Sequence, residues 1–544
     1  MADTASRDRL AERYGEEVER PFETDSGIPQ KAFYSPEDVA PNLEERLGRP
    51  GQPPFTRSPY PDLYRTKMFT MRQIAGFGSA QDTNARYRYL FEQGQTGIST
   101  DFDHPTLVGL DSDHPLARNE VGKVGVAVDT TQDVIELFDG VPLDRVTVSL
   151  TINHPTPVLL GMLCLTAESQ GLPWSVLNGT TQNEPLKEFY AQKTYVFPPR
   201  AALKLMTDTL EFGIKHLPQW KVLSVSGGHV RENGANAIQE MAFSLSDAIT
   251  YVQWGLERGL DIDDIARNVT FHHVIHMDFF EEIAKLRALR RMWTSIIRDR
   301  FHARDPKNWR FRVHVQTGCE NLTAQMPIVN VARTAIQALA GALAGVQSLH
   351  VNGMDEAYSI PSEEAMKVAL RTSQLVGYET RATNVVDPLG GSYYVEWLTD
   401  ELEKRAWELI KTIEDRGGML SSVEDGYISR LVGDEAHRKQ KQIETGQRLI
   451  IGVNKFVDED VRHLEVFRAS REMRDRQLTR LAAYKAARDA RSVEAAVDRV
   501  REAAAKNQNV MDPIIAAQRA HATEGEIIGA LKDVYGEYQP ETGF

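Results

Sequence analysis

Cysteine is scarce in this sequence, whose 544 residues include only Cys164 and Cys319. The two lie far apart, and neither has a second Cys or a His at zinc-ligand spacing, so a disulfide-stapled module and a cysteine-based zinc site are excluded. Long apolar runs are also lacking: the first residues are charged where a secretion signal needs an apolar segment, and no run of about 18 apolar residues follows. We therefore expect a cytoplasmic location and no membrane partner.

Positive charge is in deficit, with 63 Lys and Arg residues against 77 Asp and Glu residues and a net charge of −14. This balance argues against a nucleic-acid or anionic-membrane binder, although a local basic groove can still hold a phosphorylated ligand. The P-loop pattern G-x-x-x-x-G-K-[ST] is missing, and GFGSAQ (76–81) lacks the third glycine of a dinucleotide fingerprint. Neither kind of nucleotide site is expected.

The length exceeds the ~250–300 residues at which a single core stops growing, so several structural regions are expected. The proline-rich segment 48–61 is typical of an extended connector, and we place an N-terminal extension at 1–54. Residues 55–410 alternate short β-rich runs with amphipathic stretches, and 411–544 form a charged, Ala-rich helical region suited to packing or subunit contact.

The alternating region predicts an α/β fold with eight strands, the number that closes a (β/α)8 TIM barrel. The helix predicted over 279–301 has an apolar stripe for the barrel, while Lys285, Arg287 and Arg291 lie on its other faces. The candidate strands are 97–102, 146–152, 177–181, 221–226, 268–273, 311–315, 346–351 and 383–387.

Polar residues gather at the ends of these strands, which in a barrel form the rim that carries active sites. His272, His273 and His276 allow a metal site if the segment is helical, but it is predicted as a strand end, where a rim-lining role is favoured. Asp101 and Asp103 allow a hydrolytic carboxylate pair, although a single functional Asp101 is favoured. The rim residues are Asp101, Asn153, Gln182, His229, His272, His314, Gln316, His350, Asn352 and Asp387.

Several segments, in order and spacing over most of 50–540, resemble the large, substrate-binding subunit of adenosylcobalamin-dependent acyl-CoA mutases, the methylmalonyl-CoA mutase family. They are PFTRSPYPDLY, TMRQIAGFG, QGQTGIST, GLDSDHP, NGTTQNEPLKEF, QSLHVNG, DEA, DPLGGSYYVE and IGVNKF. The resemblance implies a (β/α) barrel, a radical reaction that moves a thioester group to the neighbouring carbon, and adenosylcobalamin as cofactor. The motif D-x-H-x-x-G of the family's cobalamin domain is missing, so we expect a separate small cobalamin-binding subunit and a heterotetramer of two large and two small subunits.

The same resemblance implies roles for residues at matching positions, with no metal ligand among them. His229 and Gln182 match the groups that hold the thioester, and a hydrogen bond from His229 to its carbonyl would stabilise charge during migration. Lys67 stands where an arginine is usual along the coenzyme A arm, so a cationic contact is retained. The expected substrate-binding residues are Tyr60, Lys67, Thr70, Arg72, Ile74, Ser99, Phe102, Thr180 and Gln192, and those facing the cofactor are Gly228, His314, Gln316, Asn352 and Glu356.

Three positions suggest the acyl group. Methylmalonyl-CoA mutases have tyrosine and arginine, arranged to hold a second carboxylate, where this chain has Ile74 and Gln192. Together with Asp101, which would accept a hydrogen bond from a substrate hydroxyl, they resemble the 2-hydroxyisobutyryl-CoA mutases within the family. The expected reaction therefore interconverts 2-hydroxyisobutyryl-CoA and 3-hydroxybutyryl-CoA.

Departures from the family pattern leave alternatives open. Gly228 replaces a tyrosine that normally packs near the adenosyl group, Asn268 replaces an arginine that contacts coenzyme A, and the second predicted strand continues as TINHPTP. A mutase for isobutyryl-CoA or for a larger 2-hydroxyacyl-CoA is one alternative, and a catalytically silent scaffold subunit is another.

Overall fold

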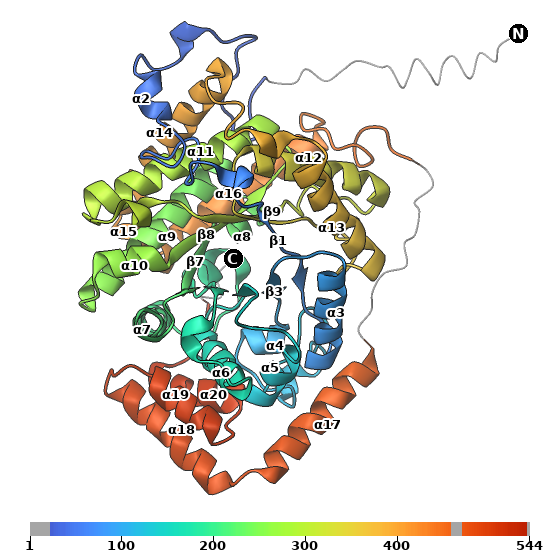
Figure 1. The fold of residues 1–544 in the computed structure, drawn as a ribbon, viewed down its shortest axis with the longest axis vertical. Coiled ribbons are helices and arrows are strands. Elements are labelled where there is room, and N and C mark those ends of the chain that lie inside the picture. Colours follow the sequence, from blue (N-terminus) through green and yellow to red (C-terminus); the bar gives the residue numbers. More distant parts are fainter. Residues whose placement is uncertain (1–21, 459–469, 541–544) are drawn as a thin grey trace, which may run out of the picture.

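The centre of the structure, a computed structural model that describes residues 22–458 and 470–540, is a ring of parallel strands surrounded by helices (Figure 1). The strands are short, because only the part of each extended segment that pairs with neighbouring strands in the barrel counts as strand. They are β1 (Thr70–Met71), β2 (Ile74–Ala75), β3 (Ile98–Thr100), β4 (Val148–Leu150), β5 (Gly179–Thr181), β6 (Trp220–Lys221), β7 (Leu223–Ser226), β8 (Val269–Ile275), β9 (Val313–Thr317) and β10 (Ser348–His350).

The ten strand segments form the eight strands of the barrel, which we call staves. One ladder runs β2-β3-β4-β5-β6 and the other β7-β8-β9-β10-β1, all parallel. The ladders join because β1 and β2 are successive parts of residues 70–75, and β6 and β7 are successive parts of 220–226. The pairing of β1 with β10 closes the ring, so the expected (β/α)8 barrel is confirmed.

One predicted strand is wrong and one stave was not predicted. Residues 383–387 contain a 3-10 turn (Ala382–Asn384), and Asp387 has a positive φ of 49°, so the chain cannot run extended there. The missing stave is TMRQIA (70–75), whose polar Arg72 and Gln73 interrupt the apolar alternation that marks a strand. The other seven predicted strands overlap observed ones.

Helices cover the outside of the barrel and extend it at one end. In Figure 1, α18 to α20, in red, lie below α6 and α7, and α19 contacts both of these barrel helices. α14 crosses the expected boundary near 410 and packs on α9 and α11. The main helices are α3 (Ala80–Glu92), α5 (Thr131–Leu137), α6 (Thr156–Ser169), α7 (Pro199–His216), α9 (Ala237–Glu257), α10 (Ile262–Asn268), α11 (Phe279–Ser295), α12 (Pro327–Leu343), α13 (Glu363–Tyr378), α14 (Tyr393–Asp415), α15 (Gly418–Glu424), α16 (Tyr427–Glu444), α17 (Arg471–Ala487), α18 (Ala490–Ala505), α19 (Met511–Arg519) and α20 (Glu524–Tyr535); the short α2 (Leu43–Leu47), α4 (His104–Leu107) and α8 (Gly228–Glu232) complete them.

Helix α11 is buried on nearly all sides, because α14 covers the face that the sequence pattern assigned to charged residues. Its basic side chains are therefore paired inside the protein. Lys285 bonds Glu240 at 2.7 Å, and Arg287 bonds Asp387 and, at 2.5 Å, Glu396. Asp387, expected at the active rim, belongs instead to this packing layer.

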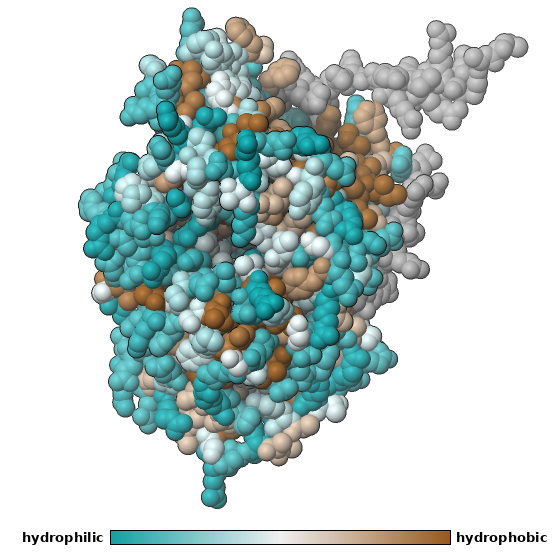
Figure 2. Space-filling view, viewed as in Figure 1, coloured by the Kyte–Doolittle hydropathy of each residue, from teal (hydrophilic) through white to brown (hydrophobic). Residues whose placement is uncertain are grey.

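The viewed surface is mainly hydrophilic, with hydrophobic side chains gathered at the upper right, over α12 and α13 (Figure 2). Ile328 and Ile336 of α12 and Leu375 and Tyr378 of α13 are among the exposed apolar residues. Within residues 22–458 and 470–540, no helix is both long and apolar enough to span a bilayer.

The ion pairs of Arg287 give a first prediction. Arg287→Met leaves the buried carboxylates of Asp387 and Glu396 without this partner, and we expect the free energy of unfolding to fall by about 3–5 kcal/mol. Arg300→Met, which removes a solvent-exposed pair with Glu414, is the control and should cost no more than about 1 kcal/mol. Urea unfolding of both variants measures the difference; equal losses would contradict the role of the buried pairs.

Candidate active site

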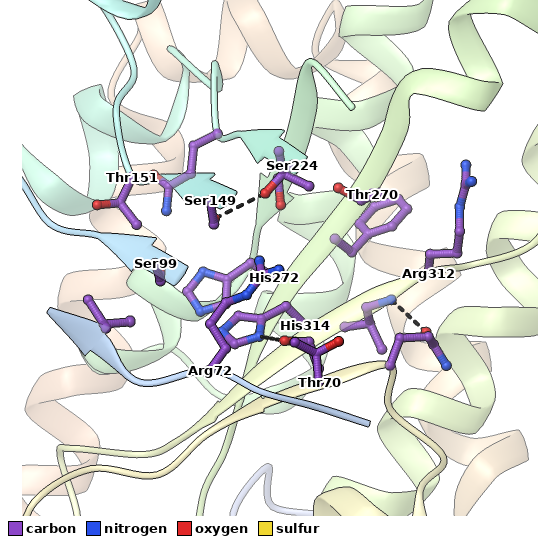
Figure 3. Close-up of a pocket in the computed structure, with 17 residues that line it drawn as sticks. Thr70, Arg72, Ser99, Ser149, Thr151, Ser224, Thr270, His272, Arg312 and His314 are labelled. Carbon is purple, nitrogen blue, oxygen red and sulfur yellow. Dashed lines mark hydrogen bonds between the residues drawn. The ribbon is translucent and has the colours of Figure 1, made fainter. Parts of the chain in front are cut away.

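A narrow channel runs inside the barrel because small polar side chains occupy the inward positions. Barrels of this kind are normally filled by bulky branched residues. Here seven staves contribute Ser or Thr and the eighth contributes His314, leaving a cavity of about 180 Å³ (Figure 3). The residues are Thr70, Ser99, Ser149, Thr180, Ser224, Thr270, His314 and Ser348. The predicted residues Thr70, Ser99 and Thr180 thus share one wall.

Two imidazoles stand beside each other in this channel. His272 and His314 are register partners on β8 and β9, and their ring centres lie 5.3 Å apart. His314 Nδ1 bonds the Ser348 hydroxyl at 2.9 Å. Burial lowers the pKa of His272 to about 3 and that of His314 well below its usual value. Both rings are therefore neutral polar surfaces at pH 7.

Basic residues surround the end of the channel where the strands begin. Arg72 lines it, donates to Thr147 Oγ1 at 2.7 Å and keeps a buried Nε without a protein partner. Arg312 also lines the channel and lies within electrostatic range of Lys221, whose pKa is lowered to about 8 by burial and by the nearby cations. Tyr60 is close by, with the Arg310 guanidinium 5.2 Å from its ring centre.

A wider cavity of about 480 Å³ opens at the carboxyl ends of the strands. Ile74, Thr151, Gln182 and His272 line both this cavity and the channel, so the two spaces adjoin. The structure brings together here Ile74, Asp101, Gln182, Gln192, His229, Gln316, Asn352 and Glu356, all of them residues expected from the sequence.

Gln182 and His229 are held by polar neighbours on the side away from the cavity. The Asn153 amide donates to Gln182 Oε1 at 3.1 Å, which leaves the Gln182 amide hydrogens free to donate to a ligand. His229 Nδ1 lies 2.9 Å from Ser226 Oγ and 3.2 Å from Lys187 Nζ, so Nε2 is the nitrogen that remains for a ligand. Burial, Lys187 and His272 lower the His229 pKa well below its usual value.

Asp101 stands at the end of β3 with its carboxylate in the cavity. Its Oδ1 lies 3.1 Å from the Thr151 hydroxyl, and burial raises its pKa above the ordinary value. Gly76 permits this placement, because a Cβ there would lie 1.9 Å from the Asp101 carbonyl oxygen. Asp103 instead caps α4 and binds Gly122 N, so the two acids do not form a catalytic pair.

A second polar group of residues lines the opposite part of the cavity. The Asn352 amide donates to Thr317 O, and His350 Nδ1 accepts the Ile74 backbone N–H at 3.1 Å. Within the described residues, the Glu356 carboxyl lacks any hydrogen bond to protein. Burial and the neighbouring Asp355 and Glu232 raise its pKa to about 8.

Four of the expected substrate- and cofactor-binding residues line neither cavity. Tyr60 and the exposed Lys67 precede the channel wall, and Phe102 is buried against Val126. Gly228 lies next to Val274 and His272, since a Cβ there would lie 3.2 Å from Val274 Cγ1 and 3.3 Å from His272 Cε1.

Several residues of the site were not expected from the sequence, notably Lys187, Ser226, Arg312 and the remaining hydroxyls of the channel. A signal for the hydroxyls existed: Ser149, Ser224 and Thr270 occupy alternate, inward positions of otherwise apolar strands. Lys187 had none, because its contact with His229 joins segments 42 positions apart. Ser226 had none either, because its bonds to Glu184 and His272 also join distant segments.

The Glu356 carboxyl gives a pH prediction. Between the unfolded pKa near 4.5 and the folded pKa of about 8, the folded state holds a proton that the unfolded state has lost, so this group makes stability fall as pH rises. Relative to wild type, Glu356→Gln should weaken that decline by at most about 1.4 kcal/mol per pH unit between pH 5 and 8. Urea unfolding across this range tests it, with exposed Glu257→Gln as control; parallel curves for wild type and Glu356→Gln would refute it.

Comparison with known proteins agrees with this arrangement. The methylmalonyl-CoA mutase family profile matches residues 23–537. The chain is 43% identical to the 2-hydroxyisobutanoyl-CoA mutase large subunit of Aquincola tertiaricarbonis, over 95% of this chain and 92% of that protein. It is 40% identical to the methylmalonyl-CoA mutase of Cereibacter sphaeroides (96% and 73% covered) and to the human mitochondrial enzyme (95% and 69%). The chain therefore belongs to the methylmalonyl-CoA mutase family and is an acyl-CoA mutase, an isomerase.

Proposed function

We propose that this chain is the large subunit of an adenosylcobalamin-dependent mutase that interconverts 2-hydroxyisobutyryl-CoA and 3-hydroxybutyryl-CoA. The observation that carries the substrate is Asp101: a carboxylate with a raised pKa faces the cavity, and Thr151 is its only side-chain hydrogen-bond partner among the described residues. A substrate hydroxyl satisfies such a group, whereas a purely aliphatic acyl group leaves it desolvated. Ile74 and Gln192 line the same cavity without the charge that a dicarboxylate needs.

The channel is suited to the pantetheine arm of coenzyme A. Its Ser and Thr hydroxyls can donate to and accept from amide groups, and their small size leaves room for a thin chain. At the end where the strands begin, Arg72, Arg312 and Lys221 supply positive charge for phosphates. Asn268 is buried and donates to Asp264 O, so the cationic contact that the family arginine would make is assigned instead to Arg312, which lines the channel.

The wider cavity fits the adenosyl part of the cofactor, which when bound supplies the radical that starts the rearrangement. The fit rests on Glu356, whose carboxyl faces the cavity and has no protein hydrogen bond in the described structure. Such a carboxyl could bond the two hydroxyls of a ribose. Asn352 and Gln316 would add amide contacts, and His314 stands deeper, in the channel wall.

At the reacting group, this chain's own residues supply hydrogen bonds and exclude water. The His229 Nε2 position and the free amide of Gln182 both face the cavity, where they would donate to the thioester carbonyl oxygen as it gains negative charge. Asp101 would hold the substrate hydroxyl and so orient the carbon that loses hydrogen. His229, Gln182 and Asp101 would all act from the positions that they already occupy without a ligand.

The partner is proposed to be a small cobalamin-binding subunit, in a heterotetramer of two large and two small chains. The support is that a relative covering nearly the whole chain is itself named a large subunit. A cytoplasmic location agrees with the two unpaired cysteines, Cys164 and Cys319.

The channel gives a prediction about coenzyme A binding. Thr180→Leu places a larger side chain in the wall beside Ser149 and should weaken binding of an acyl-CoA by about 5- to 150-fold. Thr181→Val is the matched control, because the neighbouring side chain points away from the channel. Titration calorimetry with isobutyryl-CoA measures both; equal affinities would show that the ligand does not use the channel.

The substrate is tested by Asp101→Ala in the enzyme assembled with a cobalamin-binding subunit and adenosylcobalamin. Losing a charge-assisted hydrogen bond of roughly 1.5–3 kcal/mol should lower kcat/KM for 2-hydroxyisobutyryl-CoA about 10- to 150-fold. The same change should raise turnover of isobutyryl-CoA, whose apolar carbon no longer faces a carboxylate.

Product analysis by mass spectrometry over a panel of acyl-CoAs separates the alternatives. An equal fall for both substrates, or no effect on the hydroxylated one, would contradict the proposed substrate. Preference of the wild type for isobutyryl-CoA or for a larger 2-hydroxyacyl-CoA would assign those reactions instead, and no turnover of any thioester would indicate a silent scaffold.

A further inference from the structure

Lys187 is a fully buried cation beside the cavity that the roles described so far do not use. It precedes a π-helical turn (Glu188–Gln192), in which the Lys193 N–H bonds the Glu188 carbonyl at 2.8 Å. This wider turn places residues five apart on the same side, so Lys187 and Gln192 face each other. Its position is therefore set by an uncommon piece of backbone geometry.

The ammonium group of Lys187 has two hydrogen-bond partners, Gln192 and His229, and one ion-pair partner, Glu188. Nζ lies 2.7 Å from Gln192 Oε1, 3.2 Å from His229 Nδ1 and 3.3 Å from Glu188 Oε1. An ammonium group can only donate, so His229 Nδ1 must be the unprotonated nitrogen of the neutral ring. The proton of His229 then lies on Nε2, the nitrogen left for the cavity.

The contacts of Ser226 are compatible with the same assignment. Its hydroxyl lies 2.9 Å from His229 Nδ1 and 3.1 Å from His272 Nδ1, and it has one hydrogen to give. Because His229 Nδ1 is an acceptor, Ser226 donates to it and accepts from His272 Nδ1–H. The Ser226 backbone is fixed by its N–H bond to Glu184 Oε2 at 2.6 Å. His229 and His272 consequently have opposite tautomers.

We propose that Lys187 is a positioning residue that, with Ser226, holds His229 in the Nε2–H tautomer and aims that hydrogen at the cavity. The same ammonium bonds Gln192 Oε1, so the amide hydrogens of Gln192 remain for a ligand in the cavity. Only the identity of the acceptor, the thioester carbonyl, rests on the proposed function. A ring with the opposite tautomer would present a lone pair to that oxygen and repel it.

The direct test is ¹⁵N NMR of the imidazoles in the wild-type chain without ligand, with His229→Gln used to assign the His229 signals. We expect a protonated Nε2 and an unprotonated Nδ1 at pH 7. A proton on Nδ1 would overturn the proposal, and this measurement needs no variant of Lys187 to fold.

Lys187→Met removes the donor and keeps a similar shape. Because the buried ammonium opposes protonation of His229, the pKa of His229 should be higher in the variant than in wild type. In addition, a fraction of the neutral rings should carry the proton on Nδ1. Lys204→Met is the control, since Lys204 is also a buried lysine but bonds Asp208 and Gln508 O, with no hydrogen bond to a histidine within residues 22–458 and 470–540. Identical His229 spectra in wild type and Lys187→Met would refute the positioning role.

Ligand binding separates this proposal from the proposed function. Lys187→Met should weaken the binding of isobutyryl-CoA about 2- to 10-fold. The affinity for free coenzyme A, which lacks the thioester carbonyl, should not change. Equal weakening of both would mean that Lys187 acts on the general fold. If the wild type bound no acyl-CoA, the proposed function would fail while the NMR result still decided the tautomer.

Discussion

The replacement of bulky core residues by small hydroxyls inside the barrel is the constraint on which the rest of the structure depends. Ser99, Ser149 and Thr180 are register neighbours that leave a passage where other barrels have a packed interior. The barrel therefore loses apolar burial at its centre, and stability must come from its outer layer. The enclosed α11, with its ion pairs from Arg287 to Asp387 and Glu396, belongs to that layer.

A polar interior also decides the protonation states of the site. Burial disfavours charge, so His272 and His229 stay neutral and the pKa of Glu356 rises to about 8. Lys187 is the cation at this end of the cavity whose contacts include both a carboxylate and an active-site imidazole. Its charge lowers the pKa of His229 and partly offsets the burial of Asp101.

The sequence predicted what depends on local pattern and missed what depends on long-range pairing. Seven strands and the residues that follow them were recognisable from alternation, and so was the clustering of Asp101, Gln182 and His229 at one rim. The stave at 70–75 was missed because the polar Arg72 and Gln73 interrupt its apolar alternation. Lys187 could not be assigned, since its role depends on a π-helical turn and on His229, 42 positions away.

On the proposed function, substrate choice would follow from the same hollow barrel. Because the channel and the wider cavity adjoin at Ile74 and Gln182, an acyl-CoA whose arm filled the channel would bring its acyl group to one fixed depth. At that depth Gly76 lets the end of the first stave approach Asp101 closely, so the carboxylate position is set by backbone contact and not by a flexible side chain alone. In the proposed reaction, discrimination between a hydroxylated and an aliphatic acyl group would then rest on whether the buried carboxyl of Asp101 finds a donor.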